Sequence, residues 1–172
     1  MGLSPVKIGD NRPDLFIDLA YEQGVLDERV FSLNFAGDYA VSHLTFGGYD
    51  VDQFASEPIT WHDNKSKYFW AVGLDEVRMG DGPQAKVLSG MTFKHKKAVV
   101  DSGSSYILMP FTAFWQFYDQ IKTTTDTYCE VDYYNTLYCI YDENEYHKLP
   151  ELHFKVDGKD YKVPRESLYV RI

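Results

Sequence analysis

Hydrophobic and polar residues alternate over short stretches through most of the chain. Strict alternation is typical of strands with one buried face. The stretches that show it are residues 31–35, 43–46, 68–77, 138–141, 152–156 and 161–163. The third of them predicts one long strand that ends at the turn-forming residues 79–82. The Asp-Gly pair at 157–158 lies between the last two and predicts a β-hairpin.

Two stretches have helical spacing instead. Residues 14–23 begin with Asp14, a good N-cap residue, and are followed by Gly24, which fits a helix end. Residues 111–121 follow a proline and place four large apolar side chains on one face. These side chains are Phe114, Phe117, Tyr118 and Ile121. The pattern therefore predicts a mainly β fold with two short helices.

Composition and charge narrow the possible functions. A chain of 172 residues can bury a core of its own. The net charge of −9 argues against a nucleic-acid partner, because phosphate binding needs clustered Lys and Arg. No apolar run reaches the ~18 residues that span a bilayer. The five histidines lack the spacing of metal ligands, so neither a metal nor a cofactor is expected.

The two cysteines, Cys129 and Cys139, lie in one aromatic-rich segment. An even number of cysteines in one short stretch fits a disulfide. Two reduced thiols fit the sequence equally well, so the residues alone leave both states open.

The segment that follows residues 98–100 carries the one pattern that specifies a mechanism. These three apolar residues predict a short buried strand, and a carboxylate directly after it, Asp101, is costly to ionise unless donors surround it. Gly103 allows a tight turn that brings an N–H toward the carboxylate. Ser102 and Ser104 supply hydroxyls that can donate to it or brace the loop. Hydrogen bonds to the charged form lower a carboxyl pKa, as an acid-active general base requires.

A structural alternative fits the same residues. Asp, Ser and Gly are all turn formers, so the segment 101–105 can equally be an Asx-type turn at the end of a strand.

The segment from residue 98 to Pro110 resembles the second-lobe catalytic loop of the pepsin-like aspartic proteases, the family of pepsin and cathepsin D. In that family Asp-(Ser/Thr)-Gly-(Ser/Thr)-(Ser/Thr) follows an apolar strand and precedes a proline. The flanking segments are similar in order and spacing. They are residues 2–4, 31–33, 44–50, 68–79 and 149–169. The chain is therefore identified as a member of this family over nearly its whole length.

The resemblance implies a domain organisation. Residues 1–29 would hold the tail of the first lobe and the inter-lobe segment. Residues 30–172 would hold the C-terminal lobe, a mainly β pepsin-like acid protease lobe truncated at its C-terminal end. A complete enzyme has two catalytic motifs, whereas Asp101 lies in the single one of this sequence. The second aspartate would come from the missing first lobe of the same protein.

The resemblance also implies a function, that of an aspartic endopeptidase in which two aspartates activate water. With Asp101 as the single catalytic aspartate, this chain alone is expected to be inactive. Ser102, Gly103 and Ser104 would support the catalytic loop, with the first bracing the two loops against each other and the last bonding the Asp101 carboxylate. The alternative is a non-catalytic pepsin-like binding protein that has lost the first-lobe aspartate.

Further expectations follow from the same resemblance. Phe69, Ile107 and Met109 would line the substrate pocket, although core packing explains each of them equally well. Cys129 and Cys139 would form a disulfide in a secreted, lysosomal or vacuolar enzyme. The expected partner is a polypeptide substrate.

Overall fold

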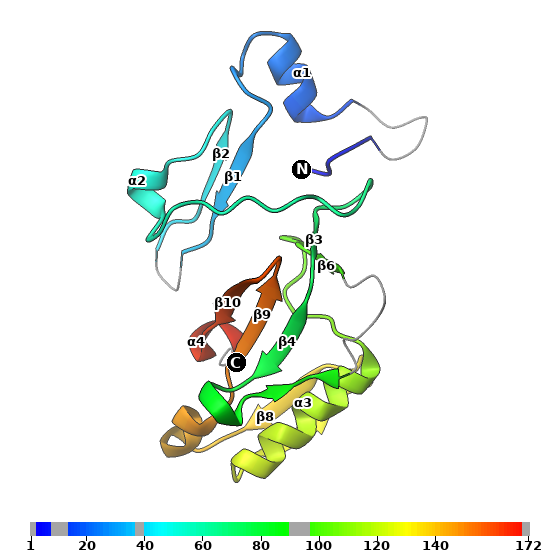
Figure 1. Cartoon of the computed structure of the whole chain (residues 1–172), viewed down its shortest axis with the longest axis vertical. Coiled ribbons are helices and arrows are strands. Elements are labelled where there is room, and N and C mark those ends of the chain that lie inside the picture. The colour runs from blue at the N-terminus through cyan, green and yellow to red at the C-terminus, as the bar shows by residue number, and fades with distance from the viewer. Residues whose placement is uncertain (1–2, 8–13, 37–39, 90–96, 170–172) are drawn as a thin grey trace. The chain divides into compact units, whose positions relative to one another are not determined.

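The computed structural model describes residues 3–7, 14–36, 40–89 and 97–169 (Figure 1). The chain divides into two compact units, residues 1–71 and residues 72–172, and each is described by itself. None of the helices in the described part of the chain is long and apolar enough to cross a membrane.

The first unit is built around a two-stranded hairpin. Strand β1 (Phe31–Asn34) pairs antiparallel with β2 (His43–Phe46), so that both predicted strands are present. The short helix α2 (Val51–Phe54) follows β2. The ring of Phe46 packs edge-on against Phe16, with 5.0 Å between the ring centroids, and this contact joins the hairpin to helix α1.

Helix α1 (Phe16–Glu22) confirms the first predicted helix but begins two residues after Asp14. Leu15 occupies the N-cap position and makes no side-chain hydrogen bond. The Asp14 carboxylate instead accepts a hydrogen bond from Lys7 Nζ at 3.3 Å. The prediction that Asp14 caps the helix is therefore wrong, because this residue lies one position too early. Gly24, with φ of +71°, ends the helix in the left-handed conformation, as predicted.

The second unit contains a four-stranded antiparallel sheet in the order β10-β9-β4-β5. Its strands are β4 (Glu76–Met79), β5 (Lys86–Val87), β9 (Leu152–Val156) and β10 (Lys159–Val163). Asp157 and Gly158 connect β9 to β10 in a two-residue turn, with φ of +46° and +83°. Two consecutive positive φ values suit the twist of a hairpin, and an Asp-Gly pair adopts them readily. The hairpin prediction is confirmed.

The described part of the second unit also contains two smaller sheets and three short helical segments. Strands β3 (Ala71–Gly73) and β6 (Lys97–Val99) pair with each other, as do β7 (Tyr128–Val131) and β8 (Leu137–Ile140). The helical segments are η1 (Gly82–Gln84), η3 (Glu143–Lys148) and α4 (Arg165–Leu168).

The prediction of one long strand over residues 68–77 is wrong. The chain forms β3 and β4 in this region, separated by Leu74 and Asp75. The two strands pair with different partners, β3 with β6 and β4 with β9 and β5. Leu74 turns into the core, and the Asp75 carboxylate accepts a hydrogen bond from the N–H of Gly158 at 2.8 Å.

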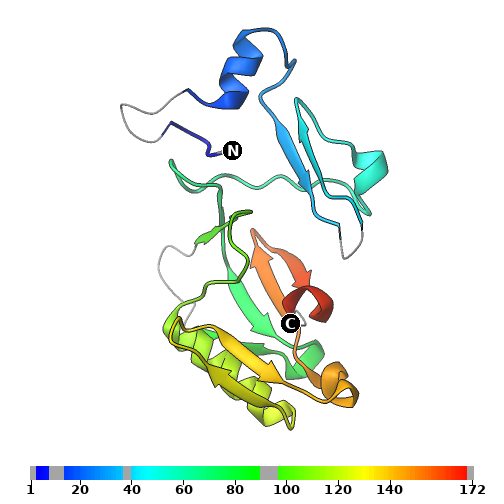
Figure 2. The same cartoon turned by 180° about the vertical axis from the view of Figure 1, so that it is seen from behind.

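Helix α3 (Phe111–Thr124) confirms the second predicted helix and extends it by three residues. Figures 1 and 2 show this helix beside the β7–β8 hairpin. Of its predicted apolar face, Phe117 and Ile121 are buried, whereas Phe114 and Tyr118 are half-buried. The other buried residues of this core are Leu74, Val77, Met79, Leu88, Ala113, Cys129, Leu149, Leu152 and Val156.

Cys129 and Cys139 lie opposite each other in the β7–β8 pair. They form a disulfide with 4.1 Å between the Cα atoms. The disulfide implied by the family resemblance is therefore confirmed.

Replacing both cysteines with alanine is expected to lower the free energy of unfolding by about 3 kcal/mol, because the unfolded chain gains the entropy of an open loop. Denaturant unfolding of the full-length protein measures this loss. A reductant should destabilise the wild type by a similar amount and leave the variant unchanged. Equal midpoints for the oxidised wild type and the variant would contradict the prediction.

A charged pair crosses the large sheet from β4 to β10. Arg78 Nη1 lies 2.8 Å from Asp160 Oδ1, and this hydrogen bond lowers the pKa of the Asp160 carboxyl. A lowered folded-state pKa stabilises the fold at pH values above the unfolded carboxyl pKa of about 3.9. That contribution is lost as the pH falls through the folded value.

The variant Arg78→Gln is therefore expected to unfold more easily than the wild type near neutral pH. The difference between the two should shrink as the pH falls below about 4. Urea unfolding of the full-length protein at a series of pH values measures it. A difference that stays constant from pH 7 to the acid limit would show that the pair does not act through the ionisation of Asp160.

Candidate active site

Asp101 lies in a tight turn two residues after the end of β6. The N–H of Gly103 donates to Asp101 Oδ1 at 2.9 Å, and the N–H of Ser104 donates to the Asp101 carbonyl at 3.2 Å. The first of these bonds is that of an Asx turn, and it also brings a donor to the carboxylate. The Asx-turn interpretation and the catalytic-loop interpretation both predict this hydrogen bond, so the bond does not choose between them. The turn does hold the Asp101 carboxylate in one position.

Gly103 is needed for this close approach. A Cβ atom at position 103 would lie 3.2 Å from Asp101 Oδ1, a distance tighter than ordinary van der Waals contact. Glycine therefore leaves space for the carboxylate oxygen against the backbone N–H.

One of the two loop serines makes a different hydrogen bond from the one that the resemblance implies. The Ser104 hydroxyl donates to the Tyr106 carbonyl at 3.1 Å, so its expected bond to the Asp101 carboxylate is not made in this structure. The turn carries the Ser104 side chain toward the residues that follow it. Ser102 is exposed on the loop, and the structure does not test its expected role as a brace.

The strand before Asp101 is less buried than predicted. Ala98 packs against the core of the second unit, but Val99 and Val100 are 56% and 64% exposed. The prediction of a buried strand is wrong for Val99 and Val100, because β6 pairs with β3 in a two-stranded sheet rather than inside a larger one. Large apolar side chains are exposed after the loop as well, at Tyr106, Ile107 and Leu108.

The three residues predicted to line a substrate pocket have different surroundings. Phe69 belongs to the first unit and is exposed, and Ile107 belongs to the second unit and is exposed beside the loop. Met109 is partly buried and packs against the core of the second unit. Core packing therefore accounts for Met109, whereas the exposed side chains of the other two are available for contacts.

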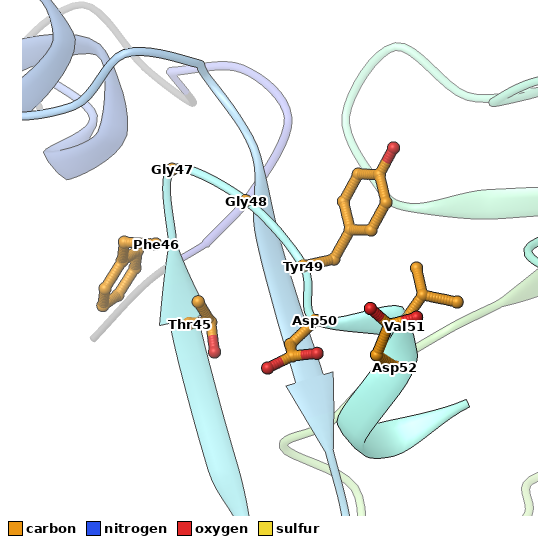
Figure 3. A pocket seen from close by; sticks show the side chains of 8 residues that line it. All are labelled: Thr45, Phe46, Gly47, Gly48, Tyr49, Asp50, Val51 and Asp52. Carbon is orange, nitrogen blue, oxygen red and sulfur yellow. The ribbon is translucent and has the colours of Figure 1, made fainter.

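The motif at residues 45–52 forms a turn and a helix cap (Figure 3). Gly47 has φ of +77°, and the Asp50 carboxylate accepts a hydrogen bond from the N–H of Gln53 at 2.9 Å, which caps α2. The segment lines a surface hollow, but all of the lining residues come from this one stretch of chain. In Figure 3 the side chains of Tyr49 and Asp50 point to opposite sides of the backbone, so these two side chains do not converge on one point.

The structure also brings together three titratable residues that the sequence did not single out. Asp81, Glu151 and His153 each place one potential ligand atom within 4.8 Å of the others. No sequence spacing could have indicated this cluster, because its members come from two segments that are distant in the chain.

Residues 1–171 match the model of the family described as "Eukaryotic aspartyl protease". The chain belongs to this family. It is 23% identical to pepsin A of Gallus gallus and 24% identical to pepsin A of Bos taurus, over 171 residues in both cases. These alignments cover 99% of this chain and 41% and 42% of the two pepsins. Cathepsin E of Oryctolagus cuniculus is 31% identical over 83 residues, which are 48% of this chain and 19% of that protein.

The fold agrees with the family. The crystal structure of the aspartic proteinase from Irpex lacteus superimposes with a TM-score of 0.61 at 20% identity, covering 87% of this chain and 42% of that protein. The chain therefore has the mainly β fold of a pepsin-like lobe, as predicted. It spans about two-fifths of the length of the pepsins that it matches.

Proposed function

We propose that this chain is part of an aspartic endopeptidase and that Asp101 is one of its two catalytic carboxylates. The observation that supports this most strongly is the geometry of the turn. In a chain of the aspartyl protease family, Gly103 holds Asp101 Oδ1 by a 2.9 Å hydrogen bond and leaves the carboxylate exposed. An exposed carboxylate held in one orientation can act on a bound water molecule.

The second carboxylate is supplied by another part of the same protein, the first lobe. Two carboxylates at close range do not both ionise easily, so the pair shares a proton. The ionised member removes a proton from water as the water attacks the peptide carbonyl, and the protonated member donates to the carbonyl oxygen. Because one carboxyl must be ionised while the other stays protonated, the activity is expected at acidic pH, where carboxyls titrate.

The surroundings of Asp101 support a partner at this face. Val99, Val100 and Leu108 are exposed close to Asp101 in the sequence, and exposed large apolar side chains can pack against a partner. In the proposed enzyme the first lobe covers part of this surface, and Ser102 braces the two catalytic loops. Ile107, and Phe69 from the first unit, contact the polypeptide substrate.

The domain organisation and the compartment belong to the same proposal. Residues 1–29 form the tail of the first lobe and the inter-lobe segment, and residues 30–172 belong to the C-terminal lobe. The disulfide between Cys129 and Cys139 supports a secreted, lysosomal or vacuolar protein, because disulfides persist in oxidising compartments.

An activity assay of the full-length protein tests the proposal. An unfolded protein substrate is incubated at pH values from 3 to 7, with and without a peptide analogue that carries a secondary alcohol in place of the scissile bond. The proposal expects cleavage near pH 3–5, where carboxyls titrate, inhibition by the analogue, and no cleavage by residues 1–172 alone. A full-length protein that binds the polypeptide but does not cleave it would instead be the non-catalytic binding protein.

A further inference from the structure

Three potential metal ligands meet where the two inner strands of the large sheet, β4 and β9, end and begin, outside the proposed catalytic loop. Glu151 directly precedes β9 and His153 is its second residue, and the two side chains reach the same place. The N–H of Gly80 donates to the Glu151 carbonyl at 2.9 Å, which brings the next residue, Asp81, to the same place. Figures 1 and 2 show β4 beside β9. Asp81 follows β4, Glu151 directly precedes β9 and His153 lies in β9.

The histidine of this cluster has no hydrogen-bond partner for one ring nitrogen. His153 is 8% exposed, and its Nε2 atom is buried without a hydrogen bond. This atom lies 2.9 Å from Asp81 Oδ1, but the geometry is not that of a hydrogen bond. A buried polar atom that makes no hydrogen bond lowers stability, so it requires an explanation. A cation between the imidazole and the carboxylates would satisfy both groups.

We propose that Asp81, Glu151 and His153 bind a divalent transition-metal cation. Zn²⁺ is the ion best suited to them, because it accepts imidazole nitrogen and carboxylate oxygen together. Three protein ligands leave a fourth tetrahedral position for water. The Asp81 side chain is 58% exposed, which gives the ion a path from solvent.

Two basic side chains balance the carboxylates of this cluster in the metal-free protein. Lys162 Nζ pairs with Glu151 and lies 3.8 Å from Asp81 Oδ2, and Arg165 Nη1 lies 3.4 Å from Glu151 Oε1. The Lys162 side chain is half-exposed, so its ammonium can move into water when a metal ion enters. Arg165 can remain bonded to Glu151, because ligating carboxylates commonly keep such outer partners. The Lys162 ammonium and the metal ion therefore compete for the same carboxylates.

The proposal predicts opposite changes in Zn²⁺ affinity when a ligand is replaced and when Lys162 is replaced. In the full-length protein, Zn²⁺ affinity is measured by competition with a chromophoric chelator, and the thermal unfolding midpoint is followed with and without Zn²⁺. His153→Gln and Asp81→Asn should each abolish one Zn²⁺ site and its stabilising effect. Lys162→Gln should tighten binding about tenfold, because a cation next to the site is removed. His147→Gln, a change of an exposed histidine on η3, should bind like the wild type.

Two results would overturn the proposal. One is a wild-type protein that binds no more Zn²⁺ than Asp81→Asn, an exposed substitution whose folding can be checked independently. The other is a Lys162→Gln variant whose affinity for Zn²⁺ is unchanged or weaker. Either result would mean that these three residues serve only to balance charge and to pack β9, without binding a metal ion.

Discussion

Asp101→Asn in the full-length protein is expected to lower kcat by a factor of about 10²–10⁴, the usual contribution of a positioned acid or base. Asparagine keeps the shape of the side chain, and its Oδ1 can accept the same hydrogen bond from Gly103. The turn should therefore persist while the group that removes a proton from water is lost. Steady-state cleavage of a peptide at pH 3–5 measures the effect, and thermal unfolding shows whether the fold is intact.

A matched control distinguishes the loss of a catalytic group from the loss of one negative charge. Asp126→Asn removes an exposed carboxylate between α3 and β7 and should cleave at the wild-type rate. If Asp101→Asn also retains the wild-type rate, then Asp101 serves the turn alone and the catalytic assignment is wrong.

Ile121→Ala is expected to lower the free energy of unfolding strongly. Ile121 is fully buried, with 0% of its surface exposed, and belongs to the same core as Leu149 and Leu152. Removing its side-chain carbons leaves a cavity between helix and sheet, and such changes cost about 2–5 kcal/mol. Urea unfolding of the full-length protein measures this change.

The neighbouring residue supplies the control for this prediction. Lys122 is exposed on the same turn of α3, so Lys122→Ala should change the free energy of unfolding by no more than about 0.5 kcal/mol. Similar losses in the two variants would mean that α3 does not pack on the sheet through Ile121.

Features with a local cause could be predicted from the sequence. The turn at Asp157 and Gly158 and the helix end at Gly24 each depend on a residue that accepts positive φ. Helix α3 has an apolar face repeated over several turns, so its periodicity was sufficient to predict it. The break at Leu74 was not predictable in this way, because it depends on β3 and β4 pairing with different strands.

The candidate sites likewise divide into features with a local cause and features that depend on distant segments. The Asp101 loop could be found because its chemistry lies within a few adjacent residues. The direction of the Ser104 hydroxyl could not, since the turn geometry decides between the Asp101 carboxylate and the Tyr106 carbonyl. The cluster of Asp81 with His153 depends on the register of β4 against β9, which no spacing in the sequence reveals.

A structure of the full-length protein bound to the secondary-alcohol analogue tests the role of Asp101 most directly. The alcohol oxygen replaces the attacking water at the scissile bond. The proposed function predicts that this oxygen lies within hydrogen-bond distance, about 2.6–3.2 Å, of an Asp101 carboxylate oxygen and of a second aspartate from the first lobe. An analogue bound with its alcohol away from Asp101 would contradict the proposal that this residue is catalytic.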